Sequence, residues 1–115
     1  MNIKMNRSGS VLIARIQGEL DLSTAPLFRE KVEAELEQFE GVKHLLLDLE
    51  ETPFIDSSGL GVILGRFKHI SQRGGRLSAI NVSDHVRRIF ELSGLLKIMS
   101  IQSTLENALN SLKER

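Results

Sequence analysis

Segments with strand-like and helix-like hydrophobic periodicity alternate along this chain, and this alternation restricts the fold more than any other feature. Two strand-like segments come first, residues 3–6 and 11–16, separated by the turn-forming Ser8-Gly9-Ser10. From there, segments with apolar residues every three or four positions alternate with short apolar runs. The predicted order is ββαβαβαβα. This order indicates an α/β fold with an open, mixed, mostly parallel β-sheet, an antiparallel first strand and flanking helices.

The boundaries of the helices follow from capping residues. Ser23 or Thr24, Asp56, Ser83 and Ser103 can each accept a hydrogen bond from the first turn of a helix. The last of them has the Ser-x-x-Glu spacing of a capping box. The apolar runs between these helices, at residues 45–49, 76–80 and 97–101, are the predicted strands.

Length and composition indicate one globular domain spanning residues 1–115. The 115 residues include 15 basic and 15 acidic side chains, and 41% are hydrophobic. A nucleic-acid binder would show a basic excess, so direct binding to nucleic acid is not expected. With no cysteine and no long apolar stretch, we expect a cytoplasmic protein without a membrane segment.

Charge is nevertheless unevenly distributed along the chain. Residues 1–56 hold 6 basic and 11 acidic groups, whereas residues 57–115 hold 9 and 4. Such an asymmetry can guide a protein partner. It can equally reflect solvated faces that neutralise each other once the chain is folded.

The segment around Asp56-Ser57-Ser58-Gly59 places two hydroxyl groups and a carboxylate where a loop becomes a helix. Backbone N–H groups at a helix start are unpaired, and the helix dipole there favours negative charge. A phosphate on either serine would accept hydrogen bonds from these N–H groups and would be stabilised by the helix dipole. The segment is therefore a candidate modification switch. An ordinary helix cap with small residues in the first turn explains the same pattern.

Three glycines, Gly59, Gly61 and Gly65, lie inside the helical stretch that follows. Each should cost about 1 kcal/mol relative to alanine, so a compensating interaction is expected. The close approach of another backbone, from this chain or from a partner, is one such interaction, and a cradle for a nucleotide is another. The dinucleotide-binding fingerprint would need a third glycine where Leu64 stands, and the P-loop pattern is also missing.

The sequence contains no readable catalytic or metal constellation, so an enzyme is not expected. The strained Gly-x-Ser-x-Gly turn of serine hydrolases is absent around both serines. His44, His69 and His85 are scattered without the spacing of metal ligands, and no cofactor is predicted. The glutamates of the first helix are best explained as a solvated face.

Three motifs together carry a family resemblance: residues 18–21 (Gly-Glu-Leu-Asp), residues 54–66 (Phe-Ile-Asp-Ser-Ser-Gly-Leu-Gly-Val-Ile-Leu-Gly-Arg) and residues 87–95. In this order and spacing the chain resembles, over its full length, the bacterial STAS-domain anti-sigma factor antagonists. The central block is similar to that of the sporulation members. Leu22 and Ser23 stand where those members tend to have two histidines, and general-stress members share the architecture, so the sigma pathway stays open.

The resemblance implies a partner-switching protein. Its unmodified form would bind an anti-sigma factor that is also a serine kinase and thereby release a sigma factor for transcription. Phosphorylation of Ser57, the serine directly after the aspartate, would end that binding, and a serine phosphatase would reset it. The partner-binding residues implied by the motifs are Asp21, Asp56, Ser57, Ser58, Gly59, Leu60 and Gly61.

One alternative function remains open at this stage. The glycine-containing helix start could hold a small ligand, such as the phosphate of a nucleotide, in which case the chain would be a small-ligand regulatory module. Titration with ATP and GTP distinguishes the two functions, because tight binding without any partner protein would favour the second.

Overall fold

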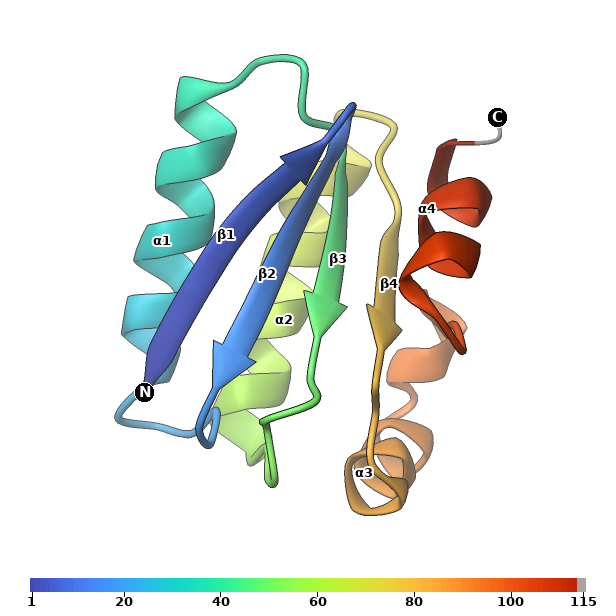
Figure 1. Ribbon diagram of the computed structural model, residues 1–115. Coiled ribbons are helices and arrows are strands. Elements are labelled where there is room, and N and C mark those ends of the chain that lie inside the picture. Colours follow the sequence, from blue (N-terminus) through green and yellow to red (C-terminus); the bar gives the residue numbers. More distant parts are fainter. Residues whose placement is uncertain (114–115) are drawn as a thin grey trace.

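A five-stranded sheet forms the centre of the molecule (Figure 1). The computed structural model describes residues 1–113. The strands lie side by side in chain order: β1 (Asn2–Ser8), β2 (Val11–Gln17), β3 (His44–Asp48), β4 (Leu77–Ile80) and β5 (Met99–Ile101). β1 is antiparallel to β2, and the remaining neighbours are parallel. The predicted α/β class and mixed sheet are therefore confirmed.

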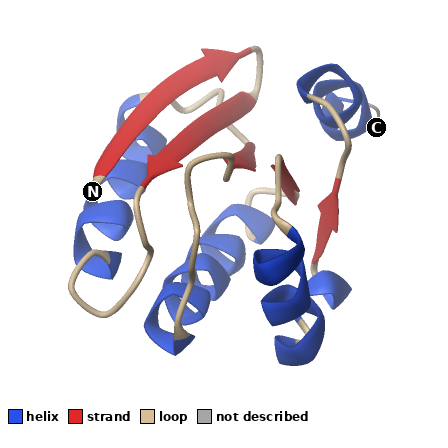
Figure 2. Ribbon diagram, turned by 60° about the horizontal axis from the view of Figure 1, so that its bottom comes forward, coloured by secondary structure: helices blue, strands red, loops and turns tan. Residues whose placement is uncertain are grey.

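Helices cover both faces of this sheet (Figure 2). Three of them, α1 (Ala25–Gln38), α2 (Ser57–Ser71) and α3 (Asp84–Ser93), contribute to the larger hydrophobic core. The fourth, α4 (Leu105–Lys113), packs on the opposite face and closes a smaller core with residues of β2, β3 and β4. A short 3₁₀ helix, η1 (Leu95–Lys97), connects α3 to β5.

β3 shows why its sequence is an unbroken apolar run. Successive side chains of a strand point to opposite faces of the sheet. Leu45 and Leu47 belong to the larger core, whereas Leu46 belongs to the smaller core beneath α4. Both faces of the strand are covered, so both must be apolar, as is typical of interior parallel strands.

Most strand boundaries lie within one or two residues of the predictions, and two of the differences have a local structural cause. The capping box was expected at Ser103 and Glu106, but α4 starts one residue later: Thr104 Oγ1 accepts the hydrogen bond from the Asn107 N–H at 3.0 Å. The last strand was expected from Lys97 but begins at Met99, because the left-handed Gly94 leads directly into η1. At Ser83 the predicted cap is confirmed, since its Oγ accepts from the Val86 N–H at 3.1 Å.

Candidate functional site at the start of helix α2

Asp56 begins α2 and joins it to the neighbouring loop. One carboxylate oxygen, Oδ1, accepts a hydrogen bond from the Gly59 N–H at 3.0 Å and caps the helix, as predicted. The other, Oδ2, accepts from the Leu22 N–H at 3.2 Å. One half-buried side chain therefore holds both the first turn of α2 and the loop between β2 and α1.

Ser57 is the first residue of α2 and is exposed to solvent. Within residues 1–113, its hydroxyl has no hydrogen-bond partner. The backbone N–H groups of Ser57 and Ser58 also have no acceptor in this part of the chain, because Asp56 takes those of Gly59 and Leu60. Two donors at the positive end of a helix dipole therefore lie beside an accessible hydroxyl, which is an arrangement that suits a phosphate group.

The loop carrying Asp21 lies at the same edge of the sheet, as the sequence predicted. Leu20 forms an isolated parallel bridge with Ile55: its N–H donates to the Phe54 carbonyl, and its carbonyl accepts from the Asp56 N–H, each at 3.1 Å. Asp21 is thereby placed next to the start of α2. The bridge acts as an extension of the sheet that fixes the two loops to each other.

Asp21 organises the first turn before α1. Its Oδ1 accepts hydrogen bonds from the N–H groups of Ser23 and Thr24, at 3.0 and 3.1 Å, and from both hydroxyls. These bonds, led by the one from the Ser23 hydroxyl, hold the pKa of the Asp21 carboxyl below its ordinary value, although burial opposes them. Thr24 occupies the N-cap position of α1, but its side chain does not cap the helix.

The space beside Gly59 is occupied by other parts of the chain, whereas the space beside Gly61 is open. A Cβ at Gly59 would lie 2.4 Å from the Leu20 carbonyl oxygen and 2.8 Å from the Ile55 side chain. A Cβ at Gly61 would meet nothing within 4 Å. Gly59 is therefore explained by the close approach of another backbone within the fold.

Gly61 and Gly65 border a groove between α1 and α2 of about 670 Å³. A Cβ at Gly65 would also meet nothing within 4 Å. Ser57, Gly61 and Gly65 follow one another at intervals of four residues, so they lie on one side of α2. The groove is also lined by the apolar residues Leu22, Ala25, Pro26 and Val62 and by the charged residues Arg29, Glu30 and Arg66. The exposed Ser57 hydroxyl therefore lies on the same side of α2 as the groove, where two glycines leave the helix backbone uncovered by side chains.

Exposed apolar side chains flank the site. Leu22 is 75% exposed, and Phe54, 38% exposed, stacks on His85 with ring centroids 5.9 Å apart. Leu60 is half-buried next to Gly59. The sequence patterns did not predict that Leu22 and Phe54 are exposed beside the site or that Phe54 stacks on His85, because these residues come from three separate segments.

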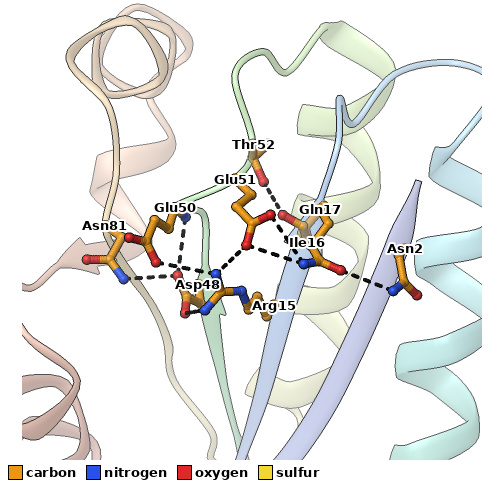
Figure 3. A network of polar contacts seen from close by, with 9 residues as sticks. All are labelled: Asn2, Arg15, Ile16, Gln17, Asp48, Glu50, Glu51, Thr52 and Asn81. Carbon is orange, nitrogen blue, oxygen red and sulfur yellow. Dashed lines mark hydrogen bonds and ion pairs between the residues drawn. The ribbon is translucent and has the colours of Figure 1, made fainter.

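A polar network holds the loop that leads into α2 (Figure 3). Thr52 Oγ1 donates to the Ile16 carbonyl at 2.8 Å, and the Gly18 N–H donates to the Glu51 carbonyl at 3.0 Å. The Arg15 guanidinium pairs with Glu51 and lies near two more carboxylates, those of Asp48 and Glu50. Because these residues are up to 36 positions apart in sequence, no local pattern could have predicted this network.

The three histidines do not converge. His44 is buried, His69 Nδ1 lies 2.7 Å from a carboxylate oxygen of Glu33, and His85 stacks on Phe54. Within the described part of the chain, no group of three potential ligands could hold a metal ion. None of the helices in residues 1–113 has the length and apolar character needed to cross a membrane.

The charge asymmetry of the sequence becomes an asymmetry between the two ends of the sheet. Six acidic side chains follow or end the parallel strands, at the end of the sheet where α2 begins: Glu19, Asp21, Asp48, Glu50, Glu51 and Asp56. Arg15 contacts three of them, Asp48, Glu50 and Glu51. Basic side chains gather where these strands begin: Lys43, Arg73 and Arg76. The candidate site therefore lies at the acidic end of the molecule.

Comparison with known proteins agrees with this geometry. The family model of the STAS domain matches residues 2–108. The chain is 41% identical to the anti-sigma F factor antagonist of Paenibacillus polymyxa, covering 98% of this chain and 96% of the relative. It is 33% identical to the anti-sigma-B factor antagonist of Bacillus subtilis (strain 168), covering 92% and 94%.

A solved structure shows the same similarity in three dimensions. The Bacillus cell fate determinant SpoIIAA in its phosphorylated form superimposes with a TM-score of 0.74 at 28% identity, covering 97% of this chain and 100% of the other. The chain belongs to the STAS domain family. Within that family it is an anti-sigma factor antagonist, a class of non-enzymatic regulators, and the resemblance read from the three motifs is confirmed.

Proposed function

We propose that the unphosphorylated chain binds an anti-sigma factor with serine-kinase activity, and that phosphorylation of Ser57 ends this binding. Binding of the unphosphorylated chain would release the sigma factor held by that partner and so allow transcription. The accessible Ser57 hydroxyl at the first position of α2 is the observation that carries the proposal. A solved relative that exists in a phosphorylated form supports it.

The proposed modification is an ordinary phosphoryl transfer. The Ser57 hydroxyl oxygen bonds to the γ-phosphorus of ATP, ADP leaves, and the hydroxyl proton passes to a base of the kinase. The product can accept hydrogen bonds from the N–H groups of Ser57 and Ser58, so α2 can carry it without unfolding. A serine phosphatase that removes the phosphate would restore the binding form.

Electrostatics explains how the phosphate would expel a partner. It adds about −1.5 to −2 charges at an end of the molecule that is already acidic. Two unit charges about 5 Å apart, at an effective dielectric constant of about 20, interact by about 3 kcal/mol. One facing carboxylate on the partner would therefore lower the affinity by roughly 100-fold. No change in the fold is required.

The proposed partner surface consists of Asp21, Asp56, Ser57, Ser58, Leu60 and Gly61, with Gly59 beneath it. Ser57 and Gly61 are exposed, whereas Asp21, Asp56, Ser58 and Leu60 are half-buried. Gly59 is buried, and its contribution is to let α2 approach Leu20. Gly61 has no structural reason to be glycine within the described chain, so the close approach of a partner is the compensation that we assign to it.

Intact-mass measurement tests the proposal. The chain is incubated with a kinase-type anti-sigma factor and ATP, and a shift of about 80 Da is expected for one phosphoryl group. Ser57→Ala should abolish the shift, whereas Ser58→Ala should retain it. Binding of the partner, measured by calorimetry, should be tight for the unmodified chain and at least roughly 100-fold weaker for the phosphorylated chain. Modification at another residue, or equal affinities for both forms, would overturn the proposal.

A further inference from the structure

A large cavity in the described part of the chain lies at the end of the sheet opposite Ser57. It has a volume of about 830 Å³ and is formed by four separate segments. These are the hairpin turn between β1 and β2, the starts of β3 and β4, and the last turn of α4. In Figure 1 they meet at the top of the view, whereas α2 begins at the bottom. Its polar and charged lining residues are Ser10, Lys43, His44, Arg76 and Lys113, and Gly9 and Gly74 also line it.

Within residues 1–113, every charged side chain that lines this cavity is basic. Lys43, Arg76 and Lys113 line it, and no carboxylate is among its lining residues in the described chain. Lys113 Nζ donates to Ser8 Oγ at 3.0 Å, and this partner is neutral. In residues 1–113, no carboxylate lies within ion-pair distance of Lys43 or Lys113. The cavity therefore presents positive charge to whatever enters it.

The end of α4, which would repel an anion, is covered. A helix C-terminus carries partial negative charge on its free carbonyls. Arg76 Nη2 donates to the carbonyls of Ser111 and Leu112, at 2.7 and 3.0 Å. The guanidinium thus compensates the helix end, and the two lysines supply the remaining attraction for an anion.

His44 adds a hydrogen-bond donor to the lining. Its Nδ1 accepts a hydrogen bond from the Arg76 backbone N–H at 2.9 Å, so the proton of the neutral ring is on Nε2. The ring is buried, and this desolvation, together with the charges of Arg76 and Lys43, lowers the pKa of His44. A neutral imidazole of this tautomer donates one N–H.

We propose that this cavity binds a small phosphorylated molecule through its phosphate group, with Lys43 and Lys113 as the charged ligands. The two ammonium groups and a neutral N–H donor suit a dianionic oxyanion. The volume falls within the usual range for small-molecule sites, about 300 to 1,000 Å³, and exceeds what one phosphate needs, so a polar phosphate ester fits better than the free ion. Apart from His44, the lining contains no aromatic ring on which a nucleobase could stack.

This site is separate from the partner switch. It lies at the basic end of the sheet, whereas Ser57 lies at the acidic end. The inference does not depend on phosphorylation of Ser57 or on any anti-sigma factor. Either proposal can fail while the other stands.

Titration of the full chain, followed by amide NMR, tests the proposal. The probes are inorganic phosphate, pyrophosphate and ribose 5-phosphate. We expect saturable shifts at Ser8–Ser10, Lys43–His44 and Gly74–Arg76, and tighter binding of ribose 5-phosphate than of inorganic phosphate. Lys43→Glu and, separately, Lys113→Glu should each weaken binding by about tenfold or more. Lys31→Glu, an exposed position on α1, is the matched control and should leave the affinity within about twofold.

Three outcomes would overturn the proposal. One is the absence of saturation with every probe, and another is equal weakening by Lys31→Glu and the two cavity variants. The third is a set of shifts centred on Ser57 and Ser58, which would place the anion at the helix start. Thermal unfolding of each variant shows whether a loss of binding comes from a loss of the fold. If one cavity variant is unstable, the other still tests the proposal.

Discussion

The Leu20 carbonyl lies so close to Gly59 that a Cβ added to Gly59 would be only 2.4 Å from the Leu20 oxygen. This contact fixes the start of α2 against the extension of β2. The same carbonyl accepts the Asp56 N–H, so the backbone at one point supports both the cap and the first turn of the helix. The position of the Ser57 hydroxyl depends on it.

Alanine at Gly59 should therefore destabilise the protein. The added methyl group forces α2 away from Leu20, and overpacking of this kind typically costs about 1 to 3 kcal/mol. Gly61→Ala is the matched control, because its methyl group enters open space and improves helix propensity by up to about 1 kcal/mol. Thermal unfolding should show a lower Tm for Gly59→Ala and an equal or higher Tm for Gly61→Ala. The reverse order would contradict this account.

Leucine at Gly61 should separate stability from binding. The side chain projects into the groove between α1 and α2, where nothing in the described chain occupies the space. We expect Tm to change little, whereas affinity for the anti-sigma factor falls by tenfold or more, about 1.4 kcal/mol. Lys31→Leu, on the exposed side of α1, serves as the control for added apolar surface. Unchanged affinity of Gly61→Leu would remove Gly61 from the proposed partner surface.

Replacing Asp56 should loosen two segments at once. Asp56→Ala removes the acceptor for both the Gly59 and the Leu22 N–H groups, and loss of an N-cap costs about 1 kcal/mol. Asp56→Asn keeps one acceptor oxygen and should retain most of that stability. Hydrogen exchange of the Leu22 and Gly59 amides is the direct measurement. Faster exchange at Gly59 alone would show that the second contact does not hold the loop.

Acid stability should depend on Asp21. Because its folded-state pKa lies below the ordinary value of 3.8, its hydrogen bonds stabilise the fold fully above that pH, and this stabilisation disappears as pH falls through the lower pKa. In Asp21→Asn the corresponding pH dependence is missing. Urea unfolding between about pH 2 and 7 should therefore show a stability difference between the two proteins that shrinks below about pH 4. A constant difference across this range would contradict the role of the ionised carboxylate.

His44 should give a second pH dependence, nearer neutrality. Its folded-state pKa is below the ordinary value of 6.5, mainly through burial, so the unfolded chain takes up a proton that the folded chain does not. Stability should fall as pH decreases from about 7 toward 5. His44→Asn can still accept the Arg76 N–H but cannot titrate, so its urea midpoint should vary less over this range. Parallel curves for both proteins would show that His44 does not cause the fall.

Much of the fold was predictable because it follows from local patterns. The alternation of strand and helix periods predicted the order of elements, and Asp56 and Ser83 were correctly predicted as caps. At α4 the pattern failed by one residue: Ser103 has the glutamate of a capping box three residues later, but Thr104 is also a capping residue type and is the one that accepts the N–H of the first turn. The start of β5 was missed because η1 needs the left-handed Gly94 and its packing against β5.

The candidate site, too, was predictable only in part. Ser57 was singled out from its motif, and the edge shared by Asp21 and Asp56 followed from the rule that parallel strands end together. The exposed apolar residues Leu22 and Phe54 were not predicted as part of its surroundings. Their exposure depends on how separate loops pack, which no sequence spacing records.

The sequence by itself determined the types of element and the motif that identifies the class, because hydrophobic period, caps and glycine positions act over a few residues. Only the tertiary structure decided that other parts of the chain pack against Gly59, whereas the space beside Gly61 is empty. It also sorted acidic and basic side chains to opposite ends of the sheet, and placed Lys43 and Lys113 around one cavity. These are relations between segments distant in the chain, and they exist only once the strands pair and the helices pack on them.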